Sequence, residues 1–166
     1  MNEKIKNQML LNAESYEFFL EKTREIEKQF FSMAASCTTE MERVVDELEE
    51  LGVKPNTAQY DLSISRRINL NIFSETVNEG QKYLTISKKF IDELEMMKDL
   101  APNILELSSD ELGIEHTSVE EFVDDYTDNI NKSQDMQREV DILILNELKM
   151  LKNIIKMNSS SLHSIQ

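Results

Sequence analysis

The sequence predicts an all-α protein, either an elongated three-helix bundle or an antiparallel coiled-coil hairpin with a third long helix. The 166 residues include three glycines and two prolines, whereas a many-stranded sheet needs a turn signal about every 8–12 residues. Apolar residues also recur at helical intervals over long stretches, as expected for helices that bury one face. We expect one domain over residues 1–157 and a flexible polar tail over residues 158–166.

The first helix is expected over residues 3–51, where nothing in the sequence interrupts a helix. An apolar row recurs every seven residues along it: Met9, Tyr16, Thr23, Phe30, Cys37, Val44 and Leu51. A stripe of this width covers one face, so the helix needs partner helices to bury it. Gly52 and Pro55 then supply the stop signals.

The second helix is expected over residues 57–100, with Asn56 as its N-cap. Apolar residues spaced by four support a helix, but residues 60–73 also alternate as a pair of strands would. The turn of that hairpin would be Ser65-Arg66-Arg67, which lacks the Gly, Asn or Asp typical of tight turns. Helix is therefore the favoured interpretation, with Gly80 as a weak point costing about 1 kcal/mol relative to alanine.

The third helix is expected over residues 118–157, after an irregular connection at 102–117 that contains a short helical turn at Ser109–Leu112. Ser118 and Glu121 have the spacing of a capping box. The second half of this helix carries apolar residues on more than one face. The part expected to bind a partner or a second copy consists of Ile142, Leu145, Leu148, Leu151 and Ile155.

The net charge of −14 is unevenly distributed. Between Asp99 and Asn131 there are ten acidic residues and no Lys or Arg. Such a surface repels phosphates, so we expect no direct binding to nucleic acid or to membranes. The candidate binding surface for a basic protein consists of Glu120, Glu121, Asp124, Asp125 and Asp128. The alternative is a solvated face, since acids near a helix N-terminus interact favourably with the helix dipole.

Two acidic motifs raise an enzymatic alternative. The run Glu47-Leu48-Glu49-Glu50-Leu51-Gly52 resembles the E-x-x-E-containing helix of the all-α, magnesium-dependent nucleotide pyrophosphatases, and Glu121-Phe122-Val123-Asp124 is similar to their E-x-x-D motif. The resemblance implies hydrolysis of nucleotides with magnesium. It covers two short segments that lie much farther apart here than in that family, and lysines to hold the phosphates are not evident.

The remaining residue types offer no further chemistry. The single Cys37 has no partner for a disulfide within the chain or for a cysteine-based zinc site, and it lies on the apolar row, as a small core residue would. His116 has no Cys or His nearby to complete a metal site. No apolar stretch has the length of a membrane span or of a signal peptide. We therefore expect a cytoplasmic protein without a cofactor or a bound metal.

These observations predict a non-enzymatic protein that works by protein–protein interaction, as a helical adaptor, scaffold or complex subunit, and that is able to form homo-oligomers. The alternative is a small acidic inhibitor, of the kind encoded by phages or mobile elements. Such an inhibitor would use the Glu106–Asp128 surface to block a basic nucleic-acid-binding or defence protein.

Overall fold

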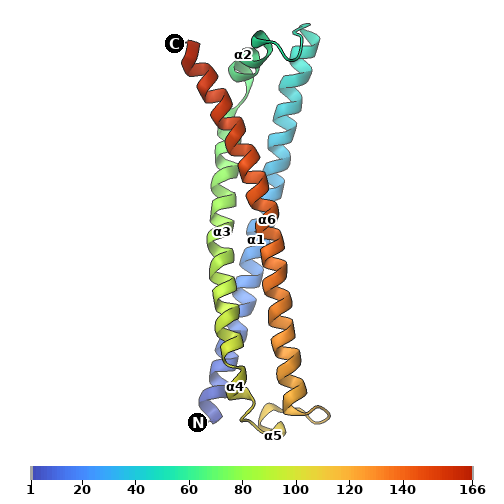
Figure 1. The fold of residues 1–166 in the computed structure, drawn as a ribbon, viewed down its shortest axis with the longest axis vertical. Helices are drawn as coiled ribbons and strands as arrows, with labels where there is room; N and C mark the ends of the chain where they lie inside the picture. Colours follow the sequence, from blue (N-terminus) through green and yellow to red (C-terminus); the bar gives the residue numbers. More distant parts are fainter. Residues whose placement is uncertain (1, 166) are drawn as a thin grey trace. The chain divides into compact units, whose positions relative to one another are not determined.

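The protein is an all-α helical bundle, as predicted (Figure 1). The computed structural model describes the backbone of residues 2–165 and the side chains of residues 2–159. Helices make up 87% of the chain, and the described backbone contains no strand. The helices are α1 (Asn2–Glu50), α2 (Ala58–Arg67), α3 (Leu70–Asp99), α4 (Ala101–Ile104), α5 (Ser109–Leu112) and α6 (Val119–Ile165).

The internal contacts divide the chain into two compact units. Unit 1 comprises Met1–Arg24 and Leu84–Ile142, and unit 2 comprises Glu25–Tyr83 and Leu143–Gln166. The three long helices, α1, α3 and α6, each contribute residues to both units. Each unit has its own buried apolar side chains.

In unit 1, the core forms around Phe90 of α3. The rings of Tyr16 and Phe19 from α1 lie 5.7 Å and 6.0 Å from its ring, as an edge contact and as a stack. From α6, Ile130 is buried beside Phe90, and the Tyr126 hydroxyl donates a 2.6 Å hydrogen bond to the Met97 carbonyl. Aromatic packing and this hydrogen bond thus join α1, α3 and α6.

A second cluster in unit 1 buries Ile5, Ile104, Leu107 and Val123. The predicted helical turn at Ser109–Leu112 is confirmed as α5. It is bounded by a reciprocal capping box between Ser108 and Glu111 and by Gly113, whose φ of 69° is favourable for glycine.

In unit 2, α3 approaches α1 and α6 closely at Gly80. A Cβ atom at this position would lie 2.6 Å from Leu148 Cδ2 and 2.8 Å from Phe30 Cε2. Both neighbouring side chains are buried. Gly80 is therefore a packing requirement of this core, a role that the sequence pattern did not indicate.

The single helix predicted over residues 57–100 is wrong at Ile68 and Asn69, where the backbone leaves the helix and separates α2 from α3. Glu40 of α1 explains the break, because its buried carboxylate accepts the Asn69 backbone N–H at 2.8 Å. Ile68 is buried at the same corner. The strand alternative for residues 60–73 is excluded, because both sides of the break are helical.

Other helix ends differ from the predictions in detail. The N-cap of α2 is Thr57, whose hydroxyl accepts the Tyr60 N–H, while Asn56 has a φ of 62°, a conformation that asparagine tolerates. Ser118 caps α6 as predicted by accepting the Glu121 N–H at 3.1 Å. The backbone of α6 continues to Ile165, beyond the predicted end at 157. The tail predicted to be flexible comprises residues 158–166. Its side chains from residue 160 onward lie outside the described part of the structure.

Candidate functional site

The predicted acidic surface lies in unit 1, at the start of α6. Glu120, Glu121, Asp124, Asp125 and Asp128 are all exposed, and none takes part in the ion pairs found among the side chains of residues 2–159. Unit 1 holds 20 Asp and Glu against nine Lys and Arg, a net charge of −11. The excess negative charge of the chain is thus concentrated in this unit.

The predicted apolar surface of α6 is divided by the structure into core residues and exposed ones. Leu148 and Leu151 are buried within unit 2, and Ile155 is half-buried. Ile142 and Leu145 are exposed. A partner therefore has access to the latter two, whereas the leucines at 148 and 151 stabilise the fold.

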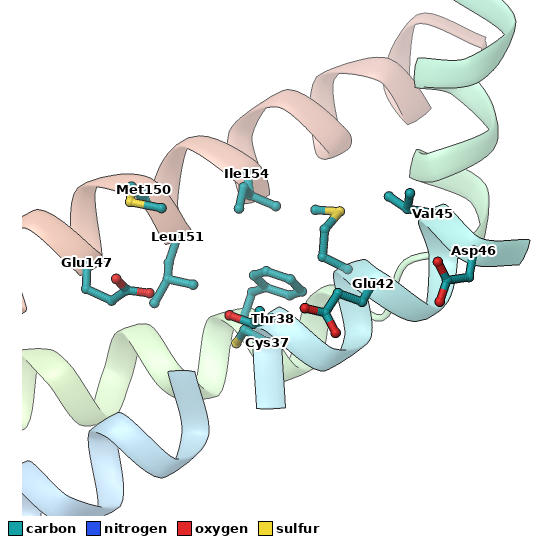
Figure 2. A pocket seen from close by; sticks show the side chains of 11 residues that line it. Cys37, Thr38, Glu42, Val45, Asp46, Glu147, Met150, Leu151 and Ile154 are labelled. Atoms are coloured by element: carbon teal, nitrogen blue, oxygen red, sulfur yellow. The ribbon is translucent and has the colours of Figure 1, made fainter. Parts of the chain in front are cut away.

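An apolar hollow of about 320 Å³ lies between α1 and α6 in unit 2. Figure 2 shows its two walls, with Cys37, Thr38, Glu42, Val45 and Asp46 on α1. On α6, the opposite wall consists of Glu147, Met150, Leu151 and Ile154. Phe73 of α3 and Met41 complete the lining. The volume is within the range of binding pockets, which start at about 300 Å³.

A second hollow, also of about 320 Å³, shares Met41 and Ile154 with the first. Its further lining residues come from α2 and the later part of α6, and are Asp61, Ile64, Met157 and Asn158. We call the two together the α1–α6 groove. Its acidic rim consists of Glu42, Asp46, Asp61 and Glu147, and no Lys or Arg is among the described lining residues.

Cys37 at the base of the groove is a core residue, as the sequence indicated. Its Sγ atom lies 3.2 Å from Thr76 Oγ1, and burial raises the pKa of the thiol. A buried thiol with a raised pKa is a poor nucleophile, because the thiolate is the reactive form. Cys37 therefore contributes packing to the groove rather than chemistry.

Two further features of α6 adjoin the groove, and the first of them shares Met150 and Met157 with its lining. The first, the Met ridge, is a row of exposed apolar residues at intervals of seven, Leu143, Met150 and Met157, which are 58%, 59% and 60% exposed. The second, the Lys edge, is Lys149, Lys152 and Lys156, which together with Met150 and Asn153 surround a hollow of about 470 Å³. The sequence pattern alone did not distinguish the ridge. Its seven-residue spacing was the available signal.

Unit 1 contains a larger hollow, of about 640 Å³, between α1 and α6. Two tyrosine hydroxyls in its lining already have partners within the chain. The Tyr126 hydroxyl is bonded to the Met97 carbonyl, and the Tyr16 hydroxyl lies 3.4 Å from Ser133 Oγ. Burial raises the pKa of Tyr126 to about 12, so the phenol stays protonated at neutral pH.

Neither acidic motif of the enzymatic alternative forms a metal centre among the described residues. In that part of the chain, no group of three or more His, Cys, Asp or Glu side chains lies close enough to hold a metal ion. Glu47 instead pairs with Arg43 at 3.2 Å and with Arg67 at 3.4 Å in unit 2. Glu121 and Asp124 belong to unit 1.

Comparison with known proteins identifies no relative. No protein-family model, curated protein or solved structure matches this chain. Within the described residues, no helix has the length and apolar character needed to cross a membrane. The function must therefore be inferred from the surface features described above.

Proposed function

We propose that this chain is a non-enzymatic protein–protein interaction protein, acting as a helical adaptor, scaffold or complex subunit. The observation that carries the proposal is the Met ridge beside the apolar α1–α6 groove. Contiguous exposed apolar surface is uncommon on proteins that act alone and is typical of interaction sites. A row of apolar side chains at seven-residue spacing is the pattern by which one helix packs against another.

The side chains of the ridge suit such a contact energetically. Burying an exposed leucine or methionine side chain contributes about 1.5–3 kcal/mol. Methionine is unbranched and polarizable, so Met150 and Met157 adapt to an uneven partner surface. Contact through these residues is apolar, and we expect it to persist at high ionic strength.

The experiment is affinity capture from the native host at low and high salt, comparing the wild type with Leu143→Glu/Met150→Glu. The matched control is Leu10→Glu/Leu11→Glu, which places the same charges on two exposed leucines of unit 1. We expect proteins retained at high salt by the wild type and by the control to be lost from the ridge variant. Equal retention by all three proteins would contradict the proposal.

A second candidate function is supported by the unpaired acids in unit 1. In this proposal the chain is a small acidic inhibitor, encoded by a phage or mobile element, whose Glu106–Asp128 surface blocks a basic nucleic-acid-binding or defence protein. Binding would then weaken steeply as salt rises. The charge reversal Glu121→Lys/Asp124→Lys would abolish it, whereas Leu143→Glu/Met150→Glu would leave it intact. Salt-resistant binding would exclude this candidate.

A further inference from the structure

We propose that the α1–α6 groove binds an amphipathic helix of another protein. The apolar face of that helix fills the groove, and its flank toward α1 and α2 carries Lys or Arg. This inference rests on the proposed function and names the chemistry of the partner for the same surface. The length, the backbone chemistry and the charge of the groove each favour this occupant.

The groove has the length of a short helical segment. It extends along α1 from Cys37 to Asp46 and along α6 from Glu147 to Asn158. At 1.5 Å per residue these walls are about 14 Å and 17 Å long, which corresponds to about three turns of helix. The rows of side chains on one helix pack between rows of the same spacing on its neighbours. Apolar residues recur in the walls at intervals of three or four: Met41 and Val45 on α1, and Met150, Ile154 and Met157 on α6.

The backbone chemistry of the walls favours a helix over an extended peptide. The lining residues of α1 and α6 lie within these two helices, where N–H and C=O groups are bonded along the helix itself. An extended peptide in the groove would bury backbone groups with no partner from either wall. A bound helix satisfies its backbone internally and presents only side chains to the groove.

The carboxylates of the acidic rim favour a cationic flank on that helix. Glu42 and Asp46 lie on the α1 wall (Figure 2), and with Asp61 of α2 they are exposed, whereas Glu147 of α6 is half-buried. The ion pairs found among the side chains of residues 2–159 include none of these four. The Lys edge surrounds a separate hollow on the other side of Met150. Apolar burial would supply most of the affinity, and the charges would decide partner and orientation.

The distribution of these charges makes the expected partner asymmetric. Three of the four rim carboxylates belong to α1 and α2, while the α6 wall continues into the Met ridge. Glu42 and Asp46 are four residues apart, which is about 6 Å along α1. Cations at i and i+4 of a helix lying beside α1 have the same separation. The partner is therefore expected to carry such a pair on one flank, next to apolar residues at i, i+4 and i+7.

Fluorescence anisotropy with the full chain and two synthetic peptides tests the proposal. Both probes are alanine-based peptides of about 18 residues with leucines at i, i+4 and i+7. The K-probe has two lysines four residues apart on one flank, and the E-probe has glutamates at the same positions. We expect the wild type to bind the K-probe with a dissociation constant of about 10 µM and the E-probe about tenfold more weakly. The helicity of the K-probe, followed by circular dichroism, should rise on binding.

Charge reversal on each acidic surface locates the bound probe. Glu42→Lys/Asp46→Lys should weaken binding of the K-probe about tenfold and strengthen that of the E-probe about tenfold, a reversed preference that a misfolded variant would not show. The control Glu120→Lys/Asp124→Lys has the same charge change at exposed acids of unit 1, also four residues apart. It should alter either dissociation constant by less than about twofold.

The apolar contribution is tested separately with Met150→Gln, at an exposed side chain of the groove wall. It should weaken binding of the K-probe about fivefold, because the methionine would be buried in the complex. An unchanged dissociation constant would mean that the probe is held by charge alone and would overturn the inference. So would an equal loss of binding in the unit 1 control, or no binding of the K-probe by the wild type at about 100 µM.

A second copy of the chain is the competing occupant. A wild type that is dimeric in sedimentation equilibrium at about 100 µM and monomeric after Glu42→Lys/Asp46→Lys would assign the groove to that copy and overturn the inference. If the K-probe fails to bind while capture from the native host is still lost in Leu143→Glu/Met150→Glu, the proposed function stands and only the cationic helix is excluded.

Discussion

Gly80 provides the sharpest test of how closely the helices of unit 2 pack. Judged by helix propensity alone, Gly80→Ala should stabilise α3 by about 1 kcal/mol. The structure predicts the opposite sign, because the new Cβ would lie 2.6 Å from Leu148 Cδ2 and 2.8 Å from Phe30 Cε2. Both side chains are enclosed in the core and have little space into which to move.

The magnitude follows from the two opposing contributions. Extra volume in a packed core costs about 1–3 kcal/mol, and helix propensity returns about 1 kcal/mol. The net result is a fall of up to about 2 kcal/mol in the free energy of unfolding. Asn78→Ala is the control, because it is exposed on the same helix and changes propensity without meeting the core. It should leave stability unchanged or raise it slightly.

Urea unfolding followed by circular dichroism measures these changes, and a double-mutant cycle isolates their cause. Leu148→Ala alone should cost about 2–5 kcal/mol by leaving a cavity. In that background, Gly80→Ala should become stabilising, because its methyl group enters the vacated space and the Phe30 ring can move. The expected coupling is about 2 kcal/mol. If Gly80→Ala stabilises the wild type as much as the Leu148→Ala variant, the reasoning is refuted.

Three further predictions concern hydrogen bonds and burial. The Arg43 guanidinium and the Asn69 N–H hold the pKa of Glu40 below its ordinary value, so the stability from Glu40 is present above that value and lost as pH falls through the folded pKa. In Glu40→Ala the free energy of unfolding, measured as a function of pH, should depend less on pH in the acid range and should be about 2 kcal/mol lower at neutral pH. An unchanged pH profile would contradict the assignment. Tyr126→Phe removes a 2.6 Å hydrogen bond to α3 and should cost about 1 kcal/mol in urea unfolding, whereas no change would mean that the bond contributes nothing. Cys37 should react with a thiol reagent at a rate that rises with urea, and rapid labelling in water would contradict its burial.

Much of the helical architecture was predictable from local pattern. The seven-residue row of the first helix identified Thr23, Phe30, Cys37 and Val44, all of which are buried. Apolar periodicity determines which face of a helix needs cover, and sparse glycine and proline permit long helices, so both properties are readable without tertiary information. The start of α6 at Ser118 and the short α5 were predictable for the same reason, because capping is local.

The candidate site was less predictable, because apolar residues on a broad helical face do not reveal which of them another helix covers. Of the apolar surface expected on α6, Leu148 and Leu151 are buried and Leu145 is exposed. The position of the Lys edge, across Met150 from an acidic groove, became visible only once α1 lay opposite α6.

By itself, then, the sequence determined the helical class, the three long helices, the concentration of acidic charge before Asn131 and the absence of a second cysteine. Tertiary structure alone decided the break at Ile68 and Asn69, because its hydrogen-bond acceptor is Glu40, 29 residues away from Asn69 along the chain. It also decided the role of Gly80, since the atoms that exclude a side chain there belong to two other helices. Local pattern records what each helix can bury, whereas the neighbours that cover it are known only after the helices have packed.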